Sequence, residues 1–282
     1  MSTDSVIVKT APKIVCIGGG NMARALVGGW LSNGISASQI SVAEPDESAR
    51  LALSHDFGIS CFSDNQLAVQ HADIWLLAVK PQLMQHVCQP LRAQAQNTAP
   101  LVISIAAGIS TESLQAWLGD NARIVRAMPN TPALIGQGAT GLYAGANVAD
   151  EARELVSLLM NAVGRTVWIE LEQQMDAVTA ASGSGPAYFF LLIEAMQQAA
   201  IELGLSPETA RELVLQTAIG AATMARLSDK SAAELRISVT SPGGTTQAAL
   251  DVFNDGQFAA LVKQALSAAQ MRGRSLSQQF GA

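Results

Sequence analysis

The sequence predicts an α/β domain with a mostly parallel, doubly wound sheet, followed by an all-α domain. Three observations support this prediction. A glycine-rich turn joins a strand to a helix near Gly18, strands then alternate with helices as far as Ile169, and only helical patterns follow Glu172. Strands that are separated by helices form parallel sheets, and the helices then cover both faces of the sheet.

The glycine-rich turn spans residues 17–23, with the sequence Ile-Gly-Gly-Gly-Asn-Met-Ala. Gly18 suits the strained backbone of a tight turn, Gly20 lets the main chain approach a pyrophosphate, and Ala23 keeps the helix close to the strand. The first N–H groups of the helix and its dipole attract an anion. This spacing predicts the dinucleotide-binding turn of a Rossmann domain, and a tight turn without a ligand is the alternative.

The later elements of this half follow from their own patterns. The run 74–79 is apolar on both faces, as expected of a buried parallel strand, and Asn33 with Gly34 ends the first helix. Strands are expected at 40–43, 59–62, 74–79, 101–105, 123–127, 139–144 and 166–169, and helices at 22–31, 46–55, around Gln66 and at 81–95.

The domain boundary is expected near Glu170, which gives a dinucleotide-binding domain at 12–171 and a helical substrate-binding and dimerisation domain at 172–282. Ser206-Pro207 and Ser231-x-x-Glu234 mark two helix starts. Helices are expected at 175–182, 186–203, 207–227, 232–239, 246–254 and 257–276. Hydrophobic residues make up 49% of the chain and charged residues only 14%, so we expect the helical half to bury a large surface against another subunit.

The composition argues against several classes of partner. The net charge is −6 and no run of lysines or arginines occurs, so we expect neither nucleic acid nor an anionic membrane. The three cysteines, Cys16, Cys61 and Cys88, lack the spacing of a disulfide framework or a metal site. Residues 1–12 lack the apolar core of a signal peptide, and no apolar segment is long enough to span a membrane. We therefore expect a cytoplasmic protein without a metal.

The loops that follow strands are the places where an open parallel sheet binds ligands. Three of them, 78–81, 104–108 and 128–132, have unusual compositions and together favour a cofactor cleft over ordinary turns. In the helical half, 182–186 and 241–246 place glycines and hydroxyls before a helix, which suits a carboxylate or a plain turn. The three histidines show no metal or triad spacing, so hydride transfer from a nicotinamide to an activated substrate fits best.

Several motifs, in order, resemble pyrroline-5-carboxylate reductase. They lie at 17–23, 78–82, 104–108, 126–133, 176–179, 182–188 and 241–246. The resemblance implies the last step of proline synthesis, reduction of 1-pyrroline-5-carboxylate to L-proline by NAD(P)H. It also implies an intertwined dimer with the active site at its interface, and larger rings of dimers are common in the family.

The resemblance further implies site residues by motif match. The cofactor would contact Ile17, Gly18, Gly19, Gly20, Asn21, Met22, Asn65, Ala78, Val79, Lys80, Pro81, Ile105, Ala106 and Ala107. The substrate would be held by Ser241, Gly244, Thr245 and Thr246, with its carboxylate on the N–H groups of 244–246. Thr246 would be the catalytic residue and would orient the ring nitrogen of the protonated imine, because a hydroxyl is too weak an acid to act alone.

The choice of cofactor depends on the turn after the second strand. Glu44 lies where an acidic side chain binds the ribose 2′-hydroxyl of NADH. Pro45 can turn this carboxylate away, Ser41 and Asn65 can offer hydrogen bonds, and Arg50 can reach a 2′-phosphate. The resemblance implies that both cofactors are often accepted and that NADPH is frequently preferred. We therefore expect activity with both, and a preference for NADPH of no more than about a hundredfold.

Two alternatives are open at this point. Another imine or hydroxyacid reductase of the same two-domain architecture is the first, and a hydroxyacid enzyme would require a catalytic lysine in the helical domain. Only two lysines, Lys230 and Lys263, lie in that domain, and neither is in a loop whose composition suggests a catalytic site. A non-catalytic dinucleotide-binding regulator is the second, and it would keep the turn at Gly18 without needing 241–246.

Overall fold

The computed structural model describes residues 12–280. Residues 1–11, which make up most of the segment in which the sequence predicts no signal peptide, lie outside the described residues. The chain forms two compact units, one that runs to Ser184 and is completed by the residues from Ala269 onward, and one formed by Gly185–Ala268. The boundary between 171 and 172 stays a prediction. Within residues 12–280, no helix has the length and apolar character needed to cross a membrane.

The first unit is built on a sheet whose order, among the described residues, is β3-β2-β1-β4-β5-β6-β7-β8. Its strands are β1 (Ile14–Ile17), β2 (Ile40–Ala43), β3 (Ser60–Phe62), β4 (Ile74–Leu77), β5 (Leu101–Ser104), β6 (Arg123–Met128), β7 (Gly138–Ala144) and β8 (Gly164–Trp168). The strands from β3 to β6 in that order are parallel, whereas β7 runs antiparallel to β6. This confirms the mostly parallel, doubly wound sheet and places its topological switch point between β1 and β4.

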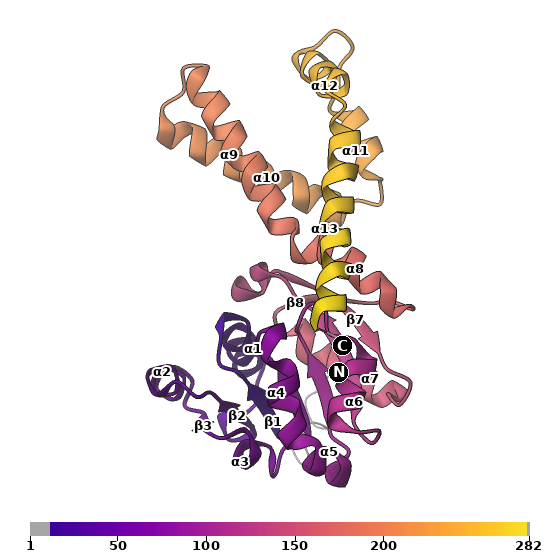
Figure 1. The fold of residues 1–282 in the computed structure, drawn as a ribbon. Coiled ribbons are helices and arrows are strands. Elements are labelled where there is room, and N and C mark those ends of the chain that lie inside the picture. The colour runs from indigo at the N-terminus through magenta and orange to yellow at the C-terminus, as the bar shows by residue number, and fades with distance from the viewer. Residues whose placement is uncertain (1–11, 281–282) are drawn as a thin grey trace, which may run out of the picture. The chain divides into compact units, whose positions relative to one another are not determined.

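Helices lie on both faces of this sheet (Figure 1). They are α1 (Asn21–Ser32), α2 (Glu47–Phe57), α3 (Asn65–Val69), α4 (Met84–Cys88), α5 (Arg92–Thr98), α6 (Thr111–Leu118) and α7 (Asp150–Asn161). Alternate residues of β1 enter separate hydrophobic clusters. Ile14 and Cys16 belong to the cluster that contains α1, whereas Val15 and Ile17 belong to the cluster that contains α6. Both faces of the strand are therefore buried, as its continuous apolar sequence predicts.

Some helices of this unit differ from the prediction. The single helix expected at 81–95 is a series of short pieces, α4 and α5 with 3₁₀ turns before and between them. Pro90 lies in the turn that separates α4 from α5, because proline has no N–H for the helical ladder. Helices α6 and α7 are absent from the prediction. The sequence nevertheless contains a helix-start signal for each. Ser110 is the N-cap of α6, and the acidic residues Asp150 and Glu151 lie in the first turn of α7.

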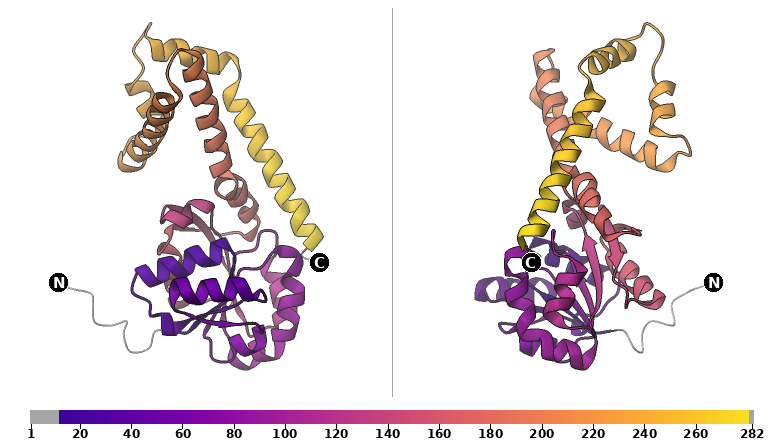
Figure 2. Two further views of the ribbon diagram at one scale, coloured as in Figure 1. Left: turned by 90° about the vertical axis from the view of Figure 1, so that its left-hand side faces the viewer. Right: turned by 45° about the vertical axis from the view of Figure 1, so that its right-hand side comes forward.

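No strand follows β8 among the described residues. The remaining elements are α8 (Met175–Val178), a π-helical turn at Thr179–Gly183, α9 (Gly185–Glu202), α10 (Pro207–Leu227), α11 (Ala232–Ser238), α12 (Thr245–Asp255) and α13 (Phe258–Phe280). Ser206 accepts from the Thr209 N–H at 3.2 Å, and Ser231 forms a capping box with Glu234, so both predicted helix starts are confirmed. Figure 2 shows α13 in yellow as one long helix. It begins in the second unit and ends in the first.

Large apolar side chains are exposed along the helices of the second unit. On α9, the exposed fractions of Phe189, Phe190 and Leu191 are 66%, 64% and 66%. Leu213 on α10 and Phe253 on α12 are exposed as well. Monomeric soluble proteins seldom leave so many large apolar side chains in water. These helices therefore carry the type of surface that a second subunit covers.

Candidate active site

Five strands of the sheet end in one row. Their last residues are aligned by the register of the pairing and are Phe62, Ala43, Ile17, Leu77 and Ser104. Four of the predicted cofactor segments leave directly from this row: the glycine turn, Glu44, 78–81 and 105–107. Because all these strands are parallel, the row is the carboxyl edge of the sheet, where open α/β sheets bind ligands. The structure thus brings these predicted residues to one edge.

The glycine turn is closed on one side and open on the other. Gly18 has a φ of +98°, and a Cβ there would lie 2.7 Å from the carbonyl oxygen of Ala78. Gly20 is the N-cap of α1, and a Cβ there would meet no atom within 4 Å. The N–H groups of Asn21 and Met22 lie in the first turn of α1, so they have no partner within the helix. This cradle fits a pyrophosphate, which needs close approach to the main chain and N–H donors.

The Glu44 carboxylate is directed at the glycine turn. Its Oε2 accepts a hydrogen bond from the Gly19 N–H at 2.9 Å, and its Oε1 accepts one from the Asp46 N–H at 3.1 Å. The expectation that Pro45 turns this carboxylate away is therefore wrong, because two N–H donors hold it beside the turn. Glu44 comes directly after β2, in the position whose side chain contacts the ribose 2′-substituent of the cofactor in this type of fold.

The other residues considered for the 2′ position have different surroundings. Arg50 Nη1 donates to the carbonyl oxygens of 44–45 at 2.8 and 2.7 Å, so its guanidinium lies beside the same turn. Asn65 is the first residue of α3. Ser41 lies inside β2, and its Oγ donates to the Ile14 carbonyl at 3.4 Å. The Ser41 hydroxyl thus already donates within the sheet, and its suggested contact with the cofactor stays a prediction.

The loops after β4 and β5 combine a cation with small side chains. Lys80 is exposed, and Pro81 begins a 3₁₀ turn. In the loop 105–107, Ala106 is buried and its N–H donates to the Ser104 Oγ at 3.4 Å. An exposed ammonium suits a phosphate, and small buried residues leave room for a flat ring.

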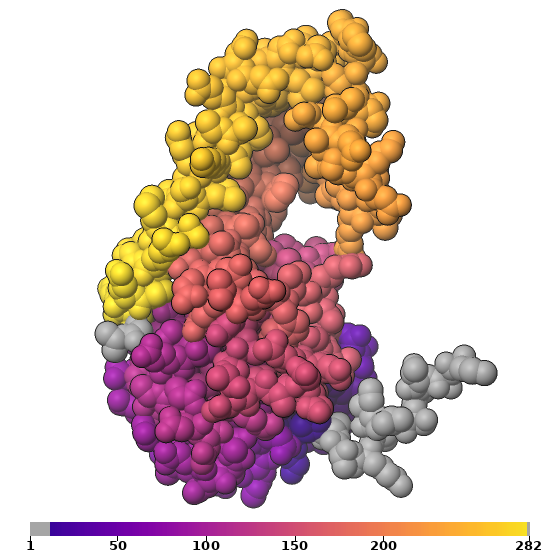
Figure 3. Space-filling model, turned by 90° about the vertical axis from the view of Figure 1, so that its right-hand side faces the viewer, coloured from indigo at the N-terminus to yellow at the C-terminus, as the bar shows by residue number. Residues whose placement is uncertain are grey.

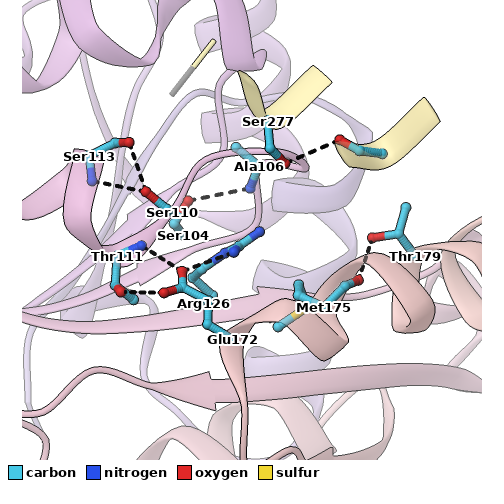
Figure 4. A network of polar contacts seen from close by, with 11 residues as sticks. Ser104, Ala106, Ser110, Thr111, Ser113, Arg126, Glu172, Met175, Thr179 and Ser277 are labelled. Carbon is cyan, nitrogen blue, oxygen red and sulfur yellow. Dashed lines mark hydrogen bonds and ion pairs between the residues drawn. The ribbon is translucent and has the colours of Figure 1, made fainter. Parts of the chain in front are cut away.

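An ion pair that the sequence analysis does not identify lies beside the loop after β5 (Figure 4). Arg126 on β6 donates through Nη1 to Glu172 at 2.9 Å, and Thr111 at the start of α6 also binds Glu172. Because 46 residues separate the two side chains in the sequence, no local pattern indicates this pair.

The predicted loop 128–132 makes a contact within the protein: Asn130 Nδ2 donates to the Ser182 carbonyl at 3.1 Å.

The loop 241–246 belongs to the second unit. Gly243 has a φ of +72°, and the N–H of Gly244 donates to the Ser241 carbonyl at 3.0 Å. The Gly244 N–H thus has a partner within the turn, and its expected contact with a substrate carboxylate stays a prediction. Thr245 and Thr246 are the first residues of α12, and both are exposed. Their N–H groups have no partner within the helix and suit an anion.

The cysteines and histidines form no second centre within residues 12–280. Burial raises the pKa of the Cys88 thiol to about 12 and also raises the pKa of the Cys16 thiol, so both stay protonated near neutral pH. All three cysteines are free thiols. The three histidines are exposed, and no group of three or more metal-ligating side chains occurs in the described part of the chain.

Comparison with known proteins places the chain in a family. A family model described as NADP oxidoreductase, coenzyme F420-dependent, matches residues 13–108, and one described as pyrroline-5-carboxylate reductase dimerisation matches residues 172–276. The pyrroline-5-carboxylate reductase of Pseudomonas aeruginosa is 51% identical over 96% of this chain and 99% of its own length. The chain belongs to the pyrroline-5-carboxylate reductase family. It is thus an NAD(P)H-dependent oxidoreductase, and the resemblance in the sequence is confirmed.

Solved structures of the family share the fold. A pyrroline-5-carboxylate reductase from Coxiella burnetii is 43% identical with a TM-score of 0.91, and the match covers 94% of this chain and 98% of that one. A pyrroline carboxylate reductase from Plasmodium falciparum, determined with NADP bound, is 30% identical with a TM-score of 0.84 over 95% of this chain and 98% of its own. The predicted Rossmann domain followed by an all-α dimerisation domain is thereby confirmed.

Proposed function

We propose that this chain reduces 1-pyrroline-5-carboxylate to L-proline with NAD(P)H, the last step of proline biosynthesis. The observation that carries the proposal is the glycine cradle at the aligned strand ends. A Cβ at Gly18 would collide with the Ala78 carbonyl, whereas the space at Gly20 is open. Family membership supports the choice of substrate. Both alternatives, a related reductase and a non-catalytic regulator, are less consistent with that membership.

The cofactor is assigned to the carboxyl edge of the sheet. We assign to it Ile17, Gly18, Gly19, Gly20, Asn21, Met22, Glu44, Asn65, Ala78, Val79, Lys80, Pro81, Ile105, Ala106 and Ala107. The first N–H groups of α1 bind its pyrophosphate, and the Lys80 ammonium adds positive charge. When bound, the nicotinamide supplies the hydride, and the protein supplies binding and orientation.

The substrate is assigned to the loop before α12, at Ser241, Gly244, Thr245 and Thr246. The N–H groups of Thr245 and Thr246 bind its carboxylate at the positive end of the helix. A cyclic imine is basic enough to be largely protonated at neutral pH, so its carbon is electrophilic without a strong acid from the protein. The Thr246 hydroxyl therefore needs only to orient the ring nitrogen by hydrogen bonding.

A comparison of substrates tests this proposal. The purified protein is mixed with NADPH and either 1-pyrroline-5-carboxylate, a cyclic imine without a carboxylate, or a 2-oxo acid, and the absorbance of the reduced cofactor is followed. We expect turnover with the first compound, weak turnover with the second and none with the third. Faster turnover of the 2-oxo acid would favour the hydroxyacid reductase instead.

The cofactor preference depends on the Glu44 carboxylate. We propose that NADPH is preferred by no more than about a hundredfold and that NADH is accepted, because two N–H donors and the nearby Arg50 guanidinium offset the negative charge. Glu44→Ser is expected to shift the ratio of kcat/KM toward NADPH, mostly through the KM for the cofactor. Initial rates with both cofactors measure this ratio. An unchanged ratio would show that the carboxylate does not face the ribose.

The apolar helices of the second unit predict that no active monomer exists. The exposed side chains on α9, α10 and α12, together with the matched dimerisation model, support an intertwined dimer. Sedimentation of the enzyme during turnover is expected to give a dimer or a larger assembly. An active monomer at assay concentration would overturn this prediction.

A ring of dimers and the cytoplasmic location stay predictions.

A further inference from the structure

The loop 105–110 begins at the strand beside Arg126 and ends at the ion pair that Arg126 forms with Glu172. At its start, Ser104 ends β5 and is in register with Arg126 on the neighbouring strand. At its end, Thr111 donates its N–H and its hydroxyl to the two carboxylate oxygens of Glu172, each at 2.7 Å. Arg126 Nη1 donates to the same carboxylate at 2.9 Å. These contacts hold the end of the loop at Thr111 (Figure 4).

The ion pair is largely shielded from water. The exposed fractions of the Arg126 and Glu172 side chains are 9% and 20%. Hydrogen bonds to charged groups in such surroundings are short and directional, so they hold their partners in one geometry. The Glu172 carboxylate therefore fixes the position at which α6 begins, and with it the path of the main chain before Thr111.

The last turns of α13 belong to the first unit, and Figure 3 shows this part of the helix in yellow on its surface. Gly108 has a φ of +78°, and a Cβ there would lie 3.2 Å from the Ser277 nitrogen. The Nε of Arg274 on the same helix lies 3.7 Å from the Oδ2 of Asp176, in the segment that follows Glu172. The loop thus contacts this helix at Gly108 and the ion pair at Thr111.

We propose that Glu172 is a positioning residue for the nicotinamide cofactor. It acts through Thr111: the carboxylate holds the start of α6 and thereby sets the main chain of 105–107, the segment assigned to the cofactor above. This inference rests on the proposed function. Loss of the carboxylate frees the start of α6, and the segment 105–107 then no longer keeps the geometry that the cofactor requires.

The test measures the Kd for NADPH by fluorescence titration of the full-length protein without substrate. Glu172→Gln keeps the shape of the side chain but loses the charge and one acceptor, and is expected to raise the Kd about tenfold. Thr111→Val loses only the hydroxyl and is expected to raise it about threefold. Thr111→Ser keeps both donors and is expected to bind NADPH within about twofold of the wild type.

A double variant separates positioning from stability. In Glu172→Leu with Arg126→Met, no buried charge is left without a partner, so the melting temperature is expected to return close to that of the wild type. The Kd for NADPH is expected to stay raised, because Thr111 still lacks its acceptor. If both the melting temperature and the Kd return to wild-type values, the effect of Glu172 is on global stability and the proposal is wrong.

A matched control lies at the opposite edge of the sheet. The exposed Asp73 side chain accepts from the Lys13 N–H at 2.9 Å, so Asp73→Asn removes a carboxylate charge from a side-chain-to-backbone hydrogen bond before β4. It is expected to leave the Kd for NADPH unchanged. Wild-type protein that does not bind NADPH would overturn the proposed function itself. Tight binding by the wild type with an unchanged Kd in Glu172→Gln would overturn only the positioning role.

Discussion

Replacing Thr246 by valine is expected to lower kcat/KM for 1-pyrroline-5-carboxylate by about one to three powers of ten. Valine keeps the volume of threonine roughly but lacks the hydroxyl that orients the ring nitrogen. A hydrogen bond to a charged partner contributes about 1.5–3 kcal/mol, which accounts for most of this range. The affinity for NADPH should stay almost unchanged, because Thr246 begins α12 and is not among the residues at the sheet edge.

Two measurements and a control variant test this expectation. Initial rates at saturating NADPH give kcat/KM for the imine, and a titration without imine gives the Kd for NADPH. Thr246→Ser keeps the hydroxyl and should retain most of the activity. Wild-type turnover in Thr246→Val would exclude a catalytic role for this hydroxyl.

Gly18→Ala is expected to destabilise the protein by about 2–4 kcal/mol. The φ of +98° is unfavourable for any residue with a Cβ, and the added methyl would lie 2.7 Å from the Ala78 carbonyl oxygen and 3.1 Å from the Val79 Cγ1. Relief of this contact requires the loop after β4 to move away from the glycine turn. Cofactor binding should therefore weaken together with stability, as measured by denaturant unfolding and NADPH titration.

Gly20→Ala is the matched comparison for Gly18→Ala. Gly20 has a φ of −69°, and a methyl there would meet no protein atom within 4 Å. Its cost in stability should not exceed about 1 kcal/mol, the difference between glycine and alanine at an N-cap. The methyl would nevertheless occupy the space assigned to the pyrophosphate, so the Kd for NADPH should rise. Equal effects of the two variants on stability would contradict this account of the turn.

Local sequence patterns predict much of the fold. The glycine turn and the apolar strands depend on neighbouring residues, and the structure places them close to the predicted positions. The helix expected at 81–95 shows where a pattern fails, because its apolar spacing continues through Pro90 although the hydrogen-bond ladder does not. Helix α6 is absent from the prediction although Ser110 caps it, Glu112 lies in its first turn, and Leu114, Trp117 and Leu118 have helical spacing, because only two turns carry this pattern.

The candidate site is predictable only where its contacts are local. Strand ends predict the row of loops, because parallel strands share one carboxyl edge. The direction of the Glu44 carboxylate depends on Gly19, 25 residues earlier in the chain. The hydrogen bond from the Gly244 N–H to the Ser241 carbonyl depends on the turn geometry, which the glycine-rich composition alone does not specify. The pair Arg126 and Glu172 joins a strand to the segment before α8 and gives no pattern in the sequence.

The most direct test of the central claim is the stoichiometry of the reaction catalysed by the purified protein. NADPH is mixed with 1-pyrroline-5-carboxylate, the loss of reduced cofactor is followed by absorbance, and L-proline is quantified by chromatography. The account predicts that one L-proline forms for each NADPH oxidised, and that Thr246→Val slows both to the same extent. Oxidation of NADPH without formation of proline, or no oxidation at all, would contradict the account.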